Sequence, residues 1–237
     1  MVKKSKSLAQ PSWNATVWRY MGVDKFFDLI LNEHLVFNRA DNFTDKNELL
    51  FDWISLDQHA SGNELKQTEF DQRCKSLKES AFVSSWSAQK NESFGLWKVY
   101  LGGNNPGVAI KTNYQDLIKS FPSSRFDIVS GRVRYHTPTR GKAFDYMVQL
   151  DDEQLIGTKY AGYSYEHEVR LFLIPPSTNF GGQKIVQIPV SLDSLIHEIW
   201  LSPWIASWFQ STFNEIVDRL RPSILERIRP SRLNDNG

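Results

Sequence analysis

Apolar and polar residues alternate along the chain with two different spacings, and each spacing predicts one kind of element. Residues 23–34, "VDKFFDLILNEH", repeat apolar side chains every three or four positions, which predicts an amphipathic helix. The same spacing predicts a helix after Pro203, whose apolar stripe is expected to dock on a core. Short runs of β-branched and aromatic residues predict strands at residues 15–21, 35–38, 81–87, 108–112, 126–136, 165–174, 184–190 and 197–204.

These elements follow one another without a regular alternation of strand and helix. That order favours a single α+β domain with a mainly antiparallel sheet and flanking helices. We expect residues 1–14 to be a flexible N-terminal tail, residues 15–222 to be the folded domain, and residues 223–237 to be a basic C-terminal tail. Gly131 is expected to bend the long strand over residues 126–136.

The composition of the chain mainly excludes certain classes of protein and site. The 237 residues are 41% hydrophobic and 13% aromatic, which is enough for a sizeable core, and a net charge of +1 predicts no general affinity for polyanions. A single cysteine, Cys74, allows no internal disulfide and fits the reducing cytoplasm. We expect no signal peptide, no membrane span and, because no histidine pair has ligand spacing, no metal site.

The sharpest local feature is the pair Glu166 and Glu168, followed by Arg170, in "YSYEHEVRLF". In a strand these three side chains project to one face, where two neighbouring carboxylates repel each other. One interpretation is a solvent-facing edge, on which Glu166 pairs with Arg170 and Glu168 with a base across the strand. The other is a pair with separate roles, one stabilising a developing cation and the other positioning or deprotonating a nucleophile.

Two other strands carry candidate binding residues. Arg19, in "VWRYM", is either a surface residue whose stem packs on an aromatic neighbour or a phosphate clamp. Ser85 and Ser87 share one face of "FVSSWSA". They either face solvent, as in an ordinary strand, or hold a ligand or brace a catalytic carboxylate.

The order of these features resembles the R-S-E class of ADP-ribosyltransferases: an arginine on an early strand, serines on a middle strand and E-x-E on a late strand. The resemblance implies a split sheet with NAD+ as substrate in the cleft between its halves. In that class the arginine holds the phosphate and ribose of NAD+, and the serine strand supports the nicotinamide half. The second glutamate stabilises the oxocarbenium ion and the first orients the acceptor. These roles would fall on Arg19, Ser85 or Ser87, Glu168 and Glu166.

A second pattern, from Arg19 to Trp208, resembles a bacterial family catalogued as a domain of unknown function. Its motifs are RY, F-S, W-x-x-Y and K-x-x-x-W-x-x-E-x-E-x-R. Here they read Arg19-Tyr20, Trp86-Ser87, Trp97 with Tyr100, and Lys159 with Tyr163 before Glu166, Glu168 and Arg170. Tryptophan replaces the phenylalanine of F-S, and Tyr163 replaces the tryptophan of the last motif. Several members resemble toxins or phage-defence components, which implies an antitoxin protein as a partner.

Together the resemblances imply a cytoplasmic mono-ADP-ribosyltransferase that modifies RNA, DNA or protein, with Glu168 and Glu166 as catalytic residues. The residues expected to bind NAD+ are Arg19, Tyr20, Ser85, Ser87, Trp97, Tyr100, Lys159, Tyr163 and Arg170. For Arg170, neutralisation of the carboxylates on its own face is the preferred role.

The acceptor is expected at the basic strand over residues 126–136. Arg132 and Arg134 would share a face and track phosphates, and Tyr135 would stack on a base; a solvated basic strand is the alternative. Two other functions stay open: a non-catalytic module that binds a nucleotide, nucleic acid or protein, and a hydrolase that acts on NAD+. Retention of nicotinamide would mark the first, and free ADP-ribose without a modified acceptor the second.

Overall fold

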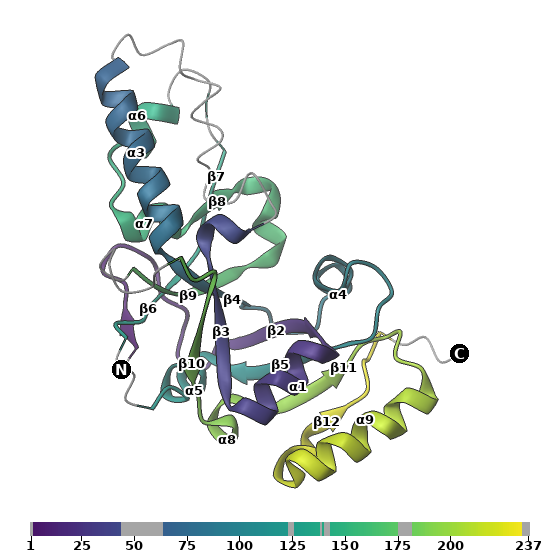
Figure 1. The fold of residues 1–237 in the computed structure, drawn as a ribbon. Helices are drawn as coiled ribbons and strands as arrows, with labels where there is room; N and C mark the ends of the chain where they lie inside the picture. Colours follow the sequence, from purple (N-terminus) through teal and green to yellow (C-terminus); the bar gives the residue numbers. More distant parts are fainter. Residues whose placement is uncertain are drawn as a thin grey trace.

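The computed structural model describes residues 2–43, 64–122, 126–137, 139, 143–174 and 182–233 (Figure 1). Its strands are β1 (Lys3–Lys4), β2 (Thr16–Gly22), β3 (His34–Arg39), β4 (Phe82–Ser87), β5 (Gly107–Asn113), β6 (Val129–Arg132), β7 (Arg134–His136), β8 (Thr158–Tyr160), β9 (Glu168–Leu173), β10 (Ile185–Pro189), β11 (Glu198–Leu201) and β12 (Ile228–Arg229). Its helices are α1 (Val23–Asn32), α3 (Glu64–Ser80), α4 (Phe94–Leu101), α5 (Tyr114–Lys119), α6 (Ala143–Met147), α7 (Asp152–Ile156), α8 (Leu192–Leu195) and α9 (Ser207–Leu220). Short 3-10 turns are η1 (Ala40–Asn42), η2 (Ala161–Glu166) and η3 (Pro222–Arg227).

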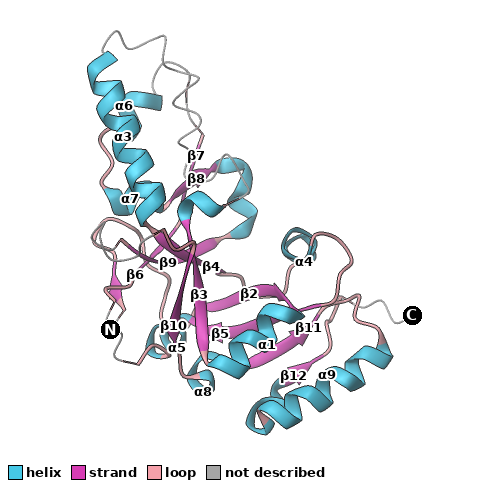
Figure 2. Cartoon of the chain, in the orientation of Figure 1, coloured by secondary structure: helices cyan, strands magenta, loops and turns pink. Residues whose placement is uncertain are grey.

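One large sheet organises the fold, with helices on its sides and ends (Figure 2). Its strand order is β1-β6-β9-β4-β2-β5-β11-β12, with β3 joined to β4 and β10 joined to β3. The pairs are antiparallel except β1 with β6 and β11 with β12, while β7 and β8 form a separate parallel pair. The predicted α+β domain with a mainly antiparallel sheet is therefore confirmed. No helix in the described ranges has both the length and the apolar character of a membrane span.

The sheet splits at β4. The first part of β4 pairs with β3 through Val83 and Phe82, whereas its end pairs with β2 at Ser87, opposite Trp18. Strands β2 and β3 diverge from there and are joined at their far ends by α1, as Figure 1 shows. The split that the resemblance implied is thus a fork in the strand pairing, with β4 at its base.

The two predicted amphipathic helices pack against each other beside the sheet. Phe26 and Phe27 of α1 lie with their ring centroids 5.5 and 5.4 Å from that of Phe213 in α9. Phe26 and Phe213 are fully buried. Burial of these rings holds α1, and with it the open end of the fork, against the main core.

Both expected tails are packed instead. Strand β1 pairs with β6, and Leu8 is buried where Gly131 and Gly157 leave room for it. A Cβ added at Gly131 would lie 2.6 Å from Leu8 Cβ, so this glycine allows close packing. At the other end β12 pairs with β11, and Ile224 is fully buried. The sequence did not predict either contact, because residues 1–14 and 223–237 are mostly polar and pairing with a distant strand has no local signal. Met1 and residues 234–237 lie outside the described residues.

Residues 126–136 form two strands rather than one bent strand. Gly131 lies inside β6, and the break falls at Val133, after which β7 leaves the large sheet to pair with β8. Arg132 and Arg134 therefore lie on strands of different sheets, and the prediction that they share a strand face is wrong.

The packing of Leu8 predicts a coupled effect on stability. A Cβ at Gly157 would lie 2.7 Å from Leu8 Cδ2, so Gly157→Ala should lower the free energy of unfolding by about 1–3 kcal/mol through overpacking. In a Leu8→Ala chain, which removes the two closest atoms and leaves the Glu153 carbonyl oxygen at 3.1 Å, the same change should cost less than in the wild type. Urea denaturation of the four chains measures this. Gly95→Ala in α4 is the matched control, because its nearest atom would be 3.8 Å away. Equal losses at Gly157 in both backgrounds would show that Leu8 is not the constraint.

Candidate active site

Arg19 lies in the fork between β2 and β3. Its guanidinium donates hydrogen bonds to the Ser84 hydroxyl of β4 and, at 3.2 Å, to the Val36 carbonyl of β3. It also lies 5.7 Å from the centroid of the Trp86 ring. Arg19 thus ties together the strands that diverge at the fork.

The Arg19 guanidinium is a partly buried charge. Burial lowers its pKa to about 10, so it still carries its charge at neutral pH. Within the described parts of the chain, no carboxylate lies at ion-pair distance from it. A buried cation without an anion is costly, which makes this position suited to an anionic ligand.

The E-x-E segment is a turn followed by a strand, not a continuous strand as predicted. Glu166 ends η2, His167 takes a left-handed conformation with φ of 46°, and β9 begins at Glu168. The Ser87 hydroxyl donates a 2.6 Å hydrogen bond to the Glu166 carbonyl, and Gln89 donates to the Tyr165 carbonyl at 2.8 Å. These bonds fix the turn against the end of β4.

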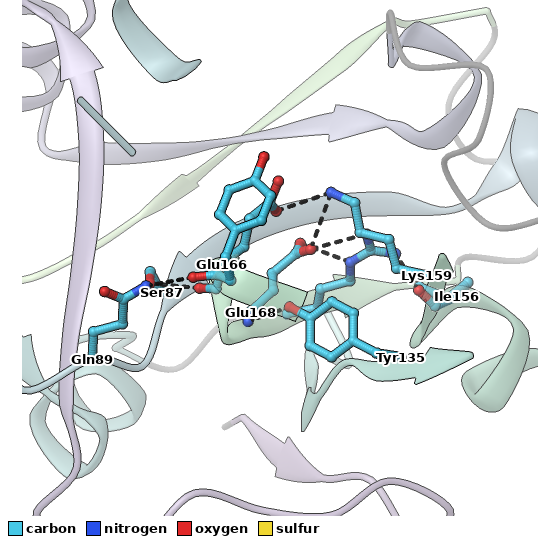
Figure 3. A network of polar contacts seen from close by, with 9 residues as sticks. Ser87, Gln89, Tyr135, Ile156, Lys159, Glu166 and Glu168 are labelled. Carbon is cyan, nitrogen blue, oxygen red and sulfur yellow. Dashed lines mark hydrogen bonds and ion pairs between the residues drawn. The ribbon is translucent and has the colours of Figure 1, made fainter. Parts of the chain in front are cut away.

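Both glutamates nevertheless converge, on a buried network of charges (Figure 3). The Lys159 ammonium of β8 lies 3.0 Å from Glu166 Oε2 and 3.6 Å from Glu168 Oε2. Arg170 donates to both oxygens of Glu168, at 2.8 Å from Nε and 3.2 Å from Nη2, and also to the Ile156 carbonyl. The four charged side chains are buried, so the interpretation as a solvent-facing strand edge is wrong.

Glu168 is the most constrained carboxylate of this network. Burial raises its pKa, while the Lys159 charge and a hydrogen bond from the Ser85 hydroxyl act against the rise. Its backbone N–H donates a 2.8 Å hydrogen bond to the hydroxyl of Tyr135. Burial alone would lower the pKa of Lys159, but the two carboxylates raise it overall, so the ammonium stays charged.

Aromatic rings form one side of the site. Tyr20 stacks on Tyr100, with ring centroids 6.2 Å apart and planes 16° apart, and on Trp18 at 6.3 Å. The Tyr20 hydroxyl accepts a 2.9 Å hydrogen bond from the Ser93 backbone. We call Trp18, Tyr20 and Tyr100 the aromatic wall. Burial and the charges of the two glutamates raise the pKa of Tyr100, so its hydroxyl is neutral.

A cleft of about 830 Å³ brings these groups together. Such a volume is in the range that holds nucleotide-sized ligands. Of the predicted site residues, those lining it are Arg19, Tyr20, Ser85, Ser87, Tyr100, Lys159, Tyr163, Glu166 and Glu168. Tyr163 also lies under the Lys159 ammonium, 4.7 Å from ring centroid to Nζ. The structure therefore brings together residues from four separate motifs.

Two residues predicted to bind NAD+ lie behind the cleft instead of in its lining. Trp97 is fully buried, packs edge-on against Tyr20 with centroids 4.8 Å apart, and donates to Glu92 Oε2 at 3.1 Å. Arg170 is fully buried beneath Glu168 and takes the neutralising role that was preferred for it. Both residues were predicted to bind NAD+ because they belong to a sequence motif. A motif indicates that a residue lies near the site, but it does not show that the residue contacts the ligand.

The residues predicted to bind the acceptor do not line the cleft either. Arg134 donates a 2.7 Å hydrogen bond to the Tyr146 hydroxyl, and the Tyr135 hydroxyl is engaged by Glu168. Tyr135 is thus a positioning residue for Glu168, which the sequence did not indicate. The register of β7 and β8, which pairs Tyr135 with Lys159, is what places both beside the carboxylates.

Among the side chains that the structure describes, no group of three or more His, Cys, Asp or Glu residues is arranged to hold a metal ion. Near the two glutamates, the position of a cation is taken by Lys159 and Arg170.

The buried network predicts a large effect of Arg170 on stability. Arg170→Met removes two hydrogen bonds to a buried carboxylate and should lower the free energy of unfolding by about 3–5 kcal/mol. Adding Glu168→Gln should restore part of the loss, because the uncompensated charge is then gone. Urea denaturation gives both values. Arg219→Met, which breaks an exposed pair with Glu215, should change stability by less than about 1 kcal/mol. A double variant no more stable than Arg170→Met would contradict the pairing.

Comparisons with known proteins add little to this geometry. No family model and no curated protein sequence matches the chain. Among solved structures, DarT of Thermus sp. 2.9 in complex with ADP-ribosylated ssDNA is 13% identical, over 94% of this chain and 95% of that chain, with a TM-score of 0.38. Its complex with NAD+ is 12% identical, over 94% and 96%, and its complex with carba-NAD+ is 13% identical, over 94% and 95%, both with a TM-score of 0.38. Similarity at this level does not identify a function, so the function has to be inferred from the geometry of the site.

Proposed function

We propose that this chain is a mono-ADP-ribosyltransferase that transfers ADP-ribose from NAD+ to a macromolecular acceptor. The observation that carries the proposal is the charge pattern of one cleft. It presents Arg19, a partly buried cation for which the described residues supply no carboxylate, together with Glu168, a buried carboxylate held by two cations. NAD+ offers both complements, a pyrophosphate anion and a ribose that becomes cationic as nicotinamide leaves.

Binding follows from the same residues. The planar guanidinium of Arg19 suits the pyrophosphate, to which it can donate in parallel. Tyr20 and Tyr100 both line the cleft, and Tyr100, which is 43% exposed, would stack on a base or on the nicotinamide ring. The cleft volume of about 830 Å³ accommodates a dinucleotide.

The reaction breaks the bond between C1′ of the ribose and the nicotinamide nitrogen. The bonding electron pair leaves with nicotinamide, which departs neutral, and positive charge develops on the ribose. Glu168 stabilises that charge, and because Arg170, Lys159 and Ser85 already orient its carboxylate, little reorganisation is needed at the moment of reaction. The acceptor nucleophile then bonds to C1′ and gives its proton to Glu166, which Lys159 holds 3.0 Å away on the same network.

The proposed function predicts a large effect of Glu168 on transfer. Glu168→Gln keeps the size of the side chain but removes its charge, so transfer should fall at least ~100-fold. The assay uses NAD+ labelled on the adenylate and a cell extract divided into RNA, DNA and protein, which also identifies the acceptor class. Glu226→Gln, an exposed position outside the cleft lining, is the control, and thermal unfolding verifies that each chain folds.

Each outcome of this assay separates the candidate functions. Wild-type transfer by a folded Glu168→Gln chain would remove Glu168 from catalysis. Free ADP-ribose without labelled acceptor would indicate an NAD+ hydrolase, and bound NAD+ without nicotinamide release a binding module.

The sequence pattern supports a further part of the proposal, a toxin in a toxin–antitoxin or phage-defence system with an antitoxin protein as partner. Expression of the wild type should then arrest growth, and expression of Glu168→Gln should not.

A second prediction concerns Arg19. Hydrogen bonds to a charged group contribute about 1.5–3 kcal/mol, so Arg19→Gln should raise the KM for NAD+ about 10- to 100-fold. Arg19→Lys keeps the charge but not the planar guanidinium. Its KM for NAD+ should lie between those of the wild type and of Arg19→Gln. Because Arg19 also ties the fork, thermal unfolding must accompany the kinetics. A folded Arg19→Gln chain with wild-type KM would show that the pyrophosphate binds elsewhere.

A further inference from the structure

We infer that Glu92 is a positioning residue for the NAD+ cleft, which binds residues 231–233 to the back of the aromatic wall and thereby holds Tyr20 and Tyr100 in place. The inference rests on the proposed function. It concerns a segment that neither the motifs nor the cleft lining includes, since Glu92 and residues 231–233 contribute no side chain to the cleft.

The Glu92 carboxylate gathers three donors from distant parts of the chain. Glu92 Oε2 accepts from Trp97 Nε1 at 3.1 Å and from the Ser231 hydroxyl at 3.0 Å. Glu92 Oε1 accepts from the Arg232 backbone N–H at 2.5 Å. One side chain therefore joins α4 to a segment 140 residues away in sequence.

The same point of the chain holds the aromatic wall. Trp97 packs edge-on against Tyr20, with ring centroids 4.8 Å apart. The backbone N–H of Ser93, next to Glu92, donates a 2.9 Å hydrogen bond to the Tyr20 hydroxyl. Tyr20 in turn stacks on Tyr100, which belongs to the same helix as Trp97. The Tyr20 ring is thus fixed at its face, its edge and its hydroxyl.

Residues 231–233 pack on the cluster that contains Trp18, Tyr20 and Trp97 and do not line the cleft. Ser231 is buried, and its hydroxyl also accepts from the Leu233 N–H at 3.0 Å. Leu233 packs on the cluster that includes Trp18, Tyr20 and Trp97. The Arg232 guanidinium lies 5.0 Å from the centroid of the Trp200 ring, and Trp200 packs edge-on against Trp18 at 5.7 Å.

We call the contacts of Glu92 with residues 231–233 the clasp. Loss of the clasp should weaken the binding of NAD+ more than it slows the chemical step. Without it, the Glu92 carboxylate that accepts from Trp97 is no longer held by residues 231–233, and the rings of the wall gain rotamer freedom, which binding of NAD+ would have to remove. Glu168, Lys159 and Arg170 are held by β8, β9 and β4, and none of these contacts involves Glu92. The KM for NAD+ should therefore rise while kcat stays nearly unchanged.

The experiment compares three lengths of the chain: full length, ending at Leu233, and ending at Pro230. The chain ending at Pro230 lacks two of the three donors to Glu92, those of Ser231 and Arg232, and should show a KM for NAD+ raised about tenfold, with kcat within about twofold. The chain ending at Leu233 keeps every contact of the clasp and should match full length. Nicotinamide release gives both constants, and calorimetry gives the Kd for NAD+ without turnover.

Substitutions at Glu92 distinguish a specific clasp from general loss of structure. Glu92→Ala should raise the KM at least as much as the shortening, and shortening the Glu92→Ala chain should add less than about twofold, because both act on one contact. Glu92→Gln, which retains an acceptor oxygen, should recover part of the effect. A shortened chain with unchanged KM would overturn the inference alone. So would a fall of kcat in parallel with stability, which marks a merely structural role. A full-length chain that neither binds NAD+ nor releases nicotinamide would overturn the proposed function as well.

Discussion

Two carboxylates and two cations lie buried together between β8 and β9, and the rest of the site is arranged around the need to keep them paired. A single unpaired charge at such a position would cost several kcal/mol, so the elements that carry the four side chains cannot shift independently. The left-handed turn at His167 brings Glu166 to the network, and Tyr135 fixes the start of β9 through the Glu168 N–H. Pairing thus converts a repulsive E-x-E sequence into a rigid, oriented carboxylate.

Arg19 is the opposite case within the same cleft. Its hydrogen bonds go to a hydroxyl and a carbonyl, which satisfy its geometry but not its charge. A paired carboxylate and an arginine for which the described residues supply no counter-charge therefore face one cavity. That asymmetry is the pattern expected of a site that binds an anion and stabilises a transient cation, whereas in a structural ion-pair cluster the charges would cancel within the protein.

The sequence predicted the elements with strong periodicity and two of the shared strand faces. The helices α1 and α9, the serine face of β4 and the common face of Glu168 and Arg170 follow from local spacing alone. What could not be predicted depends on contacts far apart in sequence. The break at Val133 follows from the pairing of β7 with β8, and Leu8 is held by two glycines more than 120 residues away. A positive φ at His167, a residue with a side chain, has no sequence signal comparable to glycine.

The order in which β4 meets its partners has a consequence for how the protein is made. Strand β4 carries Ser85 and Ser87, but its partner β9, with Glu168, is translated about 80 residues later. A nascent chain that extends past Ser87 but not yet to Glu166 contains Arg19 and both serines but neither glutamate. The long-range pairing forms only after those segments leave the ribosome. Chains that end before β9 therefore lack the charge network altogether, and the cleft acquires both kinds of charge only after β9 has been translated.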